Sequence, residues 1–110
     1  MVSILNLRQE KPQNDWDVRV DRSSVLGNLF HMKVESERND VCEKYDKYFQ
    51  TQLTNNPTFK AEIDRLVALY RKHGKLNLFC WCTPKRCHSE TVRKYIVNLI
   101  AQDGTKTKMP

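Results

Sequence analysis

Residues 75–88 read KLNLFCWCTPKRCH, and this stretch joins a predicted strand to the start of a predicted helix. Its first half, KLNLFCW (75–81), is rich in the apolar and aromatic residues that favour a β-strand. The polar loop TPKR (83–86) follows, and a helix is expected after it. Strands interleaved with helices predict an α/β fold, in which ligands usually bind beyond the carboxyl ends of the strands. The end of this strand is therefore the first place to expect a functional site.

The sequence before residue 75 supplies the remaining expected elements. Two short strands are predicted at residues 3–8 and 16–21, and the Gly27-Asn28 pair after them is typical of a turn. Apolar residues at helical spacing predict three helices. These are residues 36–53, residues 58–74 with Thr58 as the cap and Gly74 at the end, and a last helix whose core face is Val92, Tyr95, Ile96, Leu99 and Ile100.

These elements predict a single α/β domain over residues 1–101, followed by a flexible polar tail at residues 102–110. The domain is expected to be a small sandwich with a partly parallel sheet of three to four strands and about three helices. A chain of 110 residues, with 39% hydrophobic and 29% charged residues, has room for one modest core.

The sequence also predicts the compartment. No apolar run approaches the length of a membrane-spanning helix, and the N-terminus becomes charged too early for a secretory signal. We therefore expect a cytoplasmic protein with no membrane partner. In a reducing cytoplasm, clustered cysteines are metal ligands or reactive thiols more often than disulfides.

The net charge of +6 predicts an anionic partner, either a nucleotide, a nucleic acid or an acidic protein surface. Part of the excess lies beside the cysteine-rich segment, at Lys85, Arg86, Arg93 and Lys94. A solvated face that keeps the protein soluble would explain the same charges. The positive charge therefore indicates an anionic partner only where it lies next to residues that could form a functional site.

The cysteine-rich segment fits a metal site. Cys80 and Cys82 project to the same side of an extended strand, and the loop after them can bring Cys87 back toward that side. His88, Cys42 or a water would complete the set, and zinc accepts three cysteines with one histidine. An iron–sulfur cluster with one open iron is chemically possible, and so is a site with no cofactor.

The same segment also fits a reactive thiol. Cys87 is expected at the start of a helix, where free amide groups, Arg86 and His88 all favour a thiolate. Cys82, Cys87 and His88 are accordingly the candidate catalytic residues, and Arg86 could hold a phosphate instead. A disulfide switch between Cys82 and Cys87 is a further alternative. A purely structural role explains Cys42 well and explains Cys80 as well as a ligand role does.

A set of motifs, read together, resembles the family known as domain of unknown function 4326, whose members are small proteins of bacteria and their phages. Its pattern has Arg-Ser before a GNPF turn, then an arginine and a tyrosine, then CWC-x-P-x-x-CH with an acidic residue after it. The matching residues, over roughly residues 18–97, are Arg22, Ser23, Gly27–Phe30, Arg38, Tyr45, Cys80–Pro84, Cys87, His88 and Glu90.

Two positions depart from this family pattern. Leu29 stands in place of the proline, and Ser89-Glu90 replaces a glycine and an aspartate, which makes the acid one methylene longer. The resemblance brings no established activity. It implies that the glycine turn and the cysteine segment form one site, in a protein that would work in the host cytoplasm if a phage encodes it.

A combined site predicts a phosphorylated ligand. Arg22, Ser23, Gly27, Asn28 and Arg38 would form one wall, because arginine forks suit phosphate and a glycine turn lets the backbone approach a ligand. The leading hypothesis is a protein that binds a nucleotide or nucleic acid and processes it as an enzyme.

The alternative is a non-catalytic basic module, stabilised by zinc, that binds nucleic acid or a host protein. Tyr70, Trp81 and Tyr95 could stack on bases, but their spacing favours places in the core.

Overall fold

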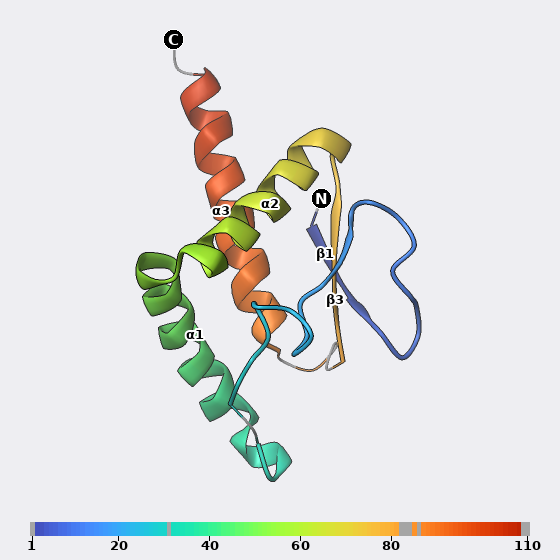
Figure 1. Cartoon of the computed structure of the whole chain (residues 1–110), viewed down its shortest axis with the longest axis vertical. Helices are drawn as coiled ribbons and strands as arrows, with labels where there is room; N and C mark the ends of the chain where they lie inside the picture. The colour runs from blue at the N-terminus through green and yellow to red at the C-terminus, as the bar shows by residue number, and fades with distance from the viewer. Residues whose placement is uncertain (1, 31, 82–84, 86, 109–110) are drawn as a thin grey trace.

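The computed structural model describes residues 2–30, 32–81, 85 and 87–108 (Figure 1). Within these residues the elements, in chain order, are β1 (Val2–Asn6), β2 (Asp17–Arg19), the 3-10 helix η1 (Glu35–Glu37), α1 (Arg38–Asn55), α2 (Pro57–His73), β3 (Leu76–Cys80) and α3 (His88–Lys108). This arrangement confirms the predicted small α/β fold.

The sheet of the described chain has three strands in the order β1-β3-β2, and β3 is parallel to both neighbours. The sequence predicted a partly parallel sheet, whereas these strands are all parallel. The reason is that each strand is followed by a connection that returns to the same end of the sheet. β3 comes last and inserts between the other two, so its Leu76 and Leu78 are fully buried.

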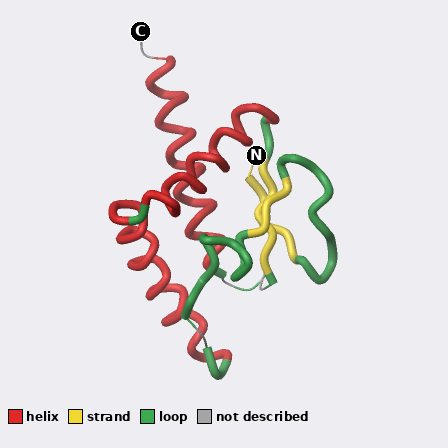
Figure 2. Tube along the Cα trace, in the orientation of Figure 1, coloured by secondary structure: helices red, strands yellow, loops and turns green. Residues whose placement is uncertain are grey.

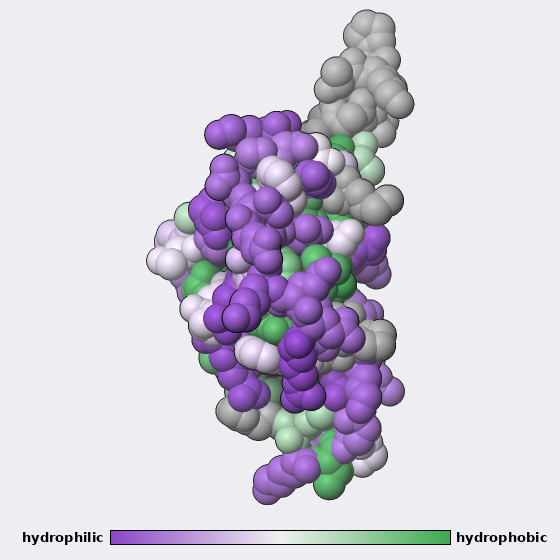
Figure 3. All heavy atoms as spheres, turned by 90° about the vertical axis from the view of Figure 1, so that its right-hand side faces the viewer, coloured by the Kyte–Doolittle hydropathy of each residue, from purple (hydrophilic) through white to green (hydrophobic). Residues whose placement is uncertain are grey.

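The two faces of the sheet are covered differently. Figures 1 and 2 show the helices on one side of the sheet and the long loop after β1 on the other. Figure 3 looks onto the loop side, where hydrophilic residues predominate and hydrophobic ones show in small areas. The main core therefore lies between the sheet and the helices, where Phe49 of α1 packs its ring against Phe59 of α2 and Tyr95 of α3, at centroid distances of 5.4 and 5.5 Å.

The ends of α2 follow from local sequence signals. Asn56 caps this helix, because its side-chain oxygen accepts hydrogen bonds from the backbone N–H groups of Thr58 and Phe59 at 3.1 and 3.3 Å. The prediction that Thr58 is the cap was therefore wrong by two residues, since Pro57 already occupies the first helical turn. Gly74 ends the helix in the left-handed conformation, with φ 74°, as predicted.

Helix α3 is longer than the apolar pattern predicts. It continues through Lys108, so residues 102–108 of the expected tail are helical in this structure. The first proline after His88 is Pro110, so no proline interrupts the helix over residues 88–108. Within the described part of the chain, none of the helices combines the length and the apolar character that crossing a membrane requires.

Candidate functional site

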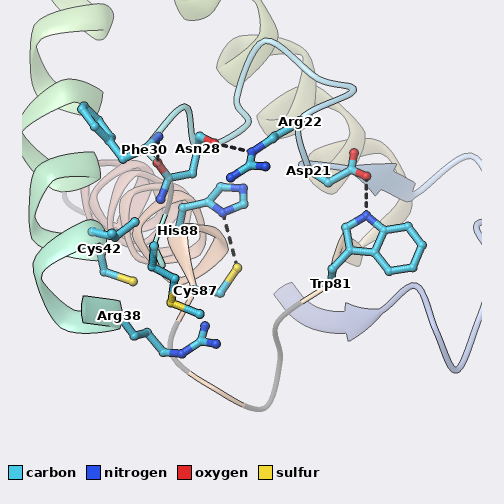
Figure 4. Close-up of a pocket in the computed structure, with 11 residues that line it drawn as sticks. Asp21, Arg22, Asn28, Phe30, Arg38, Cys42, Trp81, Cys87 and His88 are labelled. Atoms are coloured by element: carbon cyan, nitrogen blue, oxygen red, sulfur yellow. Dashed lines mark hydrogen bonds between the residues drawn. The ribbon is translucent and has the colours of Figure 1, made fainter. Parts of the chain in front are cut away.

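A pocket of about 450 Å³ lies where β3 ends and α3 begins (Figure 4). Its walls come from the 21–30 loop, the first turns of α1 and the start of α3. The lining residues are Asp21, Arg22, Asn28, Phe30, Met32, Arg38, Val41, Cys42, Trp81, Cys87 and His88. The structure thus brings five of the predicted site residues into one pocket, and these are Arg22, Asn28, Arg38, Cys87 and His88.

Cys87 takes the capping position at the start of α3. Its backbone carbonyl accepts from the N–H of Glu90 at 3.0 Å, and its own backbone N–H donates to Glu90 Oε2 at 3.1 Å. This is the reciprocal arrangement by which an acidic side chain in the first turn reaches back to the helix start. The longer acid at position 90 therefore serves to hold the backbone of Cys87 in place.

His88 has a defined hydrogen-bonding role for each ring nitrogen. Nε2 contacts the backbone carbonyl oxygen of Val20, and Nδ1 lies 3.3 Å from Sγ of Cys87. Because a carbonyl oxygen can only accept, the hydrogen-bond network assigns the proton of the neutral ring to Nε2. Nδ1 is then an acceptor that faces the thiol. The ring also packs edge-on against Tyr45 at 5.1 Å.

The Cys87–His88 pair has the arrangement of a nucleophile, a base and a group that orients the base. In this arrangement Nδ1 is placed to accept the proton of the thiol, and the Val20 carbonyl holds the imidazole in the matching tautomer. Sγ lies at the start of a helix, and free amide groups at such a place favour an anion in general. Cys87 and His88 are only 4% and 8% exposed, so the pocket that they line is their route to a small molecule.

Arg22 and Asn28 tie the loop that forms the second wall. Nε of Arg22 donates to the carbonyl of Asn28 at 3.0 Å, and the Asn28 side-chain oxygen accepts from the N–H of Phe30 at 2.9 Å. Within the described residues the terminal guanidinium nitrogens of Arg22 make no hydrogen bond. They remain available to an anion in the pocket.

Arg38 adds a second guanidinium to the pocket at the first residue of α1. It makes a two-point contact with Glu35, at 2.8 and 3.0 Å, and Lys85 approaches the same carboxylate at 3.6 Å. Hydrogen bonding from Arg38 lowers the pKa of Glu35 below its usual value. Glu35 therefore holds the Arg38 side chain in a fixed direction, and Lys85 keeps the local charge positive.

Asp21 fixes the position of Trp81 at the edge of the pocket. The indole Nε1–H donates to Asp21 at 2.8 Å, and Arg19 and the Ser23 hydroxyl donate to the same carboxylate. Burial raises the pKa of Asp21, but these hydrogen bonds outweigh it and lower the pKa well below the usual value.

The expectation that Trp81 belongs to the core was wrong, because its side chain is 47% exposed. It directly follows Cys80, the last residue of β3.

Three predicted site residues lie outside the pocket lining. The Ser23 hydroxyl donates to the Asp21 carboxylate at 2.5 Å. Cys80 is fully buried, and its Sγ accepts from the Ser89 hydroxyl at 3.4 Å. Gly27 lies against the backbone of residues 21 and 22, where an added Cβ would come within 2.5 Å of the Asp21 carbonyl oxygen. The glycine is therefore needed for the loop to close on itself, rather than for a ligand to approach.

Two further predicted residues, Cys82 and Arg86, lie outside the described residues. Among the residues that the structure does describe, no group of three or more His, Cys, Asp or Glu side chains is placed to hold a metal ion. Both ring nitrogens of His88 already have partners. Zinc and an iron–sulfur cluster accordingly stay predictions that depend on Cys82.

The pocket also contains residues that the sequence did not single out as site residues. Asp21, Phe30, Met32, Val41, Cys42 and Trp81 line it. A signal for two of them was present, because Val41 and Cys42 follow Arg38 by three and four residues and so share its helix face. Cys42 was weighed as a fourth metal ligand and expected to be structural, and it is both buried and part of the pocket wall.

Comparisons with known proteins place the chain in a family. A family model described as "Domain of unknown function (DUF4326)" matches residues 5–98, which include every described lining residue. An Enterobacteria phage T4 protein described as "Uncharacterized 12.4 kDa protein in nrdA-td intergenic region" is 28% identical over 93 residues, which cover 84% of this chain and 78% of that protein. No solved structure matches. The resemblance predicted from the motifs is confirmed.

Proposed function

The chain belongs to the DUF4326 family, whose description assigns no reaction, and we propose that it is an enzyme that binds a nucleotide and attacks it with the Cys87 thiolate. The observation that carries this proposal is the contact of Cys87 with His88, whose ring the Val20 carbonyl orients. The pair opens onto a pocket that two arginines line.

The proton transfer follows from the assigned tautomer. Nδ1 of His88 accepts the proton of the Cys87 thiol, and the sulfur forms a bond to an electrophilic atom of the nucleotide as the bond from that atom to a leaving group breaks and the leaving group takes the electron pair. The protonated ring then donates from both nitrogens, to Val20 on one side and toward the reacting centre on the other. It can return the proton to the group that leaves.

The ligand class follows from the size and lining of the pocket. A volume of about 450 Å³ suits a small molecule rather than a polymer. The guanidinium groups of Arg22 and Arg38 suit phosphate oxygens, and Phe30, Met32 and Val41 supply an apolar wall. A nucleotide combines phosphates with a planar apolar ring and so matches both parts of this lining.

Calorimetric titration of the full chain with nucleoside mono-, di- and triphosphates tests the binding step. We expect Arg22→Ala and Arg38→Ala each to weaken the tightest nucleotide about tenfold or more, because each loses charge-assisted hydrogen bonds. Arg71→Ala is the matched control, since Arg71 is an exposed arginine in the last turn of α2, away from the pocket. No measurable nucleotide binding, or equal losses in all three variants, would overturn the proposal.

Alkylation by iodoacetamide, followed at each cysteine by mass spectrometry, tests the dyad. We expect Cys87 to react about tenfold or more slowly in His88→Gln, and bound nucleotide to protect it in the unsubstituted protein. If His88→Gln leaves the rate at Cys87 unchanged, His88 is not its base. Steeply salt-dependent binding of nucleic acid that Cys87→Ser and Arg22→Ala leave unaffected would favour the non-catalytic basic module instead.

A further inference from the structure

Trp81 is a large aromatic side chain held half exposed at the edge of the pocket. Its indole N–H donates to Asp21, and its backbone carbonyl accepts from the Asn6 side chain at 3.4 Å. The ring is therefore anchored through its N–H, and the backbone of the same residue is tied to β1, although 47% of the residue faces solvent. A protein gains little stability from such a residue, because the apolar surface stays in water.

The anchoring leaves a rigid and purely apolar ring face. The polar group of the indole is already satisfied by Asp21, whose carboxylate also accepts from Arg19 and Ser23. These bonds lower the pKa of Asp21, so its carboxylate stays ionised and able to accept the indole hydrogen bond into the acidic pH range. Stacking of a ligand on Trp81 would accordingly cost little side-chain entropy, because the ring is already held in place.

The other aromatic rings near the sheet and pocket are already covered. Phe30 packs edge-on against Tyr48 at 5.8 Å, and Trp16 lies against His73 with the Lys75 ammonium over its ring. Among the described residues, Trp81 makes no such ring contact. Figure 4 shows Trp81 and Phe30 well apart in the pocket, with Arg22, His88 and Cys87 between them.

We propose that the Trp81 ring is the platform on which the base of the bound nucleotide stacks. This inference rests on the proposed function and narrows the substrate class to nucleotides that retain their base, as opposed to sugar phosphates. With the base on Trp81, the phosphates lie toward Arg22 and Arg38, and the Cys87–His88 pair lies between the two ends of the ligand. Stacking of one base on an aromatic side chain strengthens binding about 5- to 150-fold.

Calorimetric titration with two kinds of probe separates the base from the phosphate. The probes are the four nucleoside monophosphates and ribose 5-phosphate, which lacks a base. We expect the tightest nucleotide to bind the unsubstituted protein at least about fivefold more strongly than ribose 5-phosphate. Trp81→Leu should abolish that difference and leave the affinity for ribose 5-phosphate unchanged, whereas Trp81→Phe should keep most of it.

Fluorescence provides a readout that leaves Trp81 in place. The chain has two tryptophans, so Trp16→Phe leaves Trp81 as its only indole. We expect the nucleotide, and not ribose 5-phosphate, to quench this emission, with calorimetric affinities equal to those of the unsubstituted protein.

If Trp81→Leu weakens the binding of both probes equally, the ring acts only through Asp21. If it leaves the nucleotide affinity unchanged, the ring has no part in binding. Either result overturns the stacking inference and leaves the proposed function standing. Failure of both probes to bind the unsubstituted protein overturns both proposals.

Discussion

His88 shows how a single side chain can be held by neighbours at very different distances along the chain. Sγ of Cys87, the adjacent residue, and the carbonyl of Val20, 68 residues away, contact its two ring nitrogens. Adjacent residues usually point in different directions. Here they meet, because Cys87 precedes the first helical residue and its backbone is held by Glu90.

At the same scale, Asp21 should give the protein a measurable acid sensitivity. Its pKa in the folded protein lies below 3.8, the value expected of a free carboxyl group. The stabilisation that it provides is therefore present above that pH and is lost as the pH falls below it. We expect the free energy of unfolding to fall less steeply between about pH 5 and pH 3 in Asp21→Asn than in the unsubstituted protein.

Urea unfolding monitored by circular dichroism over that pH range measures the effect. The exposed Asp15 offers the control, and Asp15→Asn should retain the original steepness. Identical pH profiles for Asp21→Asn and the unsubstituted protein would mean that the carboxylate network around Trp81 does not stabilise the fold.

At the scale of elements, the pocket depends on a loop that closes tightly without regular structure. The N–H of Gly27 donates to the carbonyl of Ser24 at 3.0 Å, and the N–H of Ser24 donates to that of Asp21 at 2.9 Å. These turns bring Gly27 onto the backbone of Arg22, and the Arg22 side chain in turn bonds to Asn28. The direction of Arg22 into the pocket is thus a property of the whole loop.

Gly27→Ala should therefore damage both stability and binding. The added methyl group would lie 2.5 and 2.6 Å from backbone atoms of residues 21 and 22, which cannot move aside as a flexible side chain could. We expect a loss of about 1–3 kcal/mol in the free energy of unfolding, together with weaker nucleotide binding.

Gly74→Ala is the matched control, because Gly74 has a left-handed φ of 74° but nothing within 4 Å of an added Cβ. It should cost about 1–2 kcal/mol and leave the affinity for nucleotide unchanged. Chemical denaturation and calorimetry on both variants measure the two effects. Unchanged nucleotide affinity in Gly27→Ala would show that nucleotide binding does not depend on the closure of this loop.

At the scale of the whole molecule, the helical layer and the loop that forms the pocket are joined by a buried hydrogen bond. The hydroxyl of Tyr45 in α1 donates to the carbonyl of Leu26 at 2.6 Å, and both residues are fully buried. Burial raises the pKa of this hydroxyl above its usual value, so it stays a donor at neutral pH. The same ring packs against His88, so the contact links α1, the loop and the start of α3.

Tyr45→Phe should leave the Leu26 carbonyl buried without its donor. We expect the free energy of unfolding to fall by about 1–3 kcal/mol, as measured by urea denaturation. Tyr48→Phe on the same helix is the control, since the Tyr48 ring is partly exposed and its hydroxyl makes no hydrogen bond within the described residues. A loss no larger than in Tyr48→Phe would show that solvent replaces the missing donor.

The sequence alone determined the elements and the place of the site. Helix spacing, the Gly74 end of α2 and the strand at residues 76–80 are local patterns, and local patterns are set by side chains a few residues apart. The motif pairing of the 22–30 loop with the cysteine segment predicted that the two segments lie together, and both line the same pocket.

Only the tertiary structure decided which groups act on one another. The contact of His88 with Val20 and the exposure of Trp81 both depend on segments that meet only after folding. Exposure and hydrogen-bond partners are properties of the surroundings of a residue, and for these residues the surroundings come from distant parts of the chain.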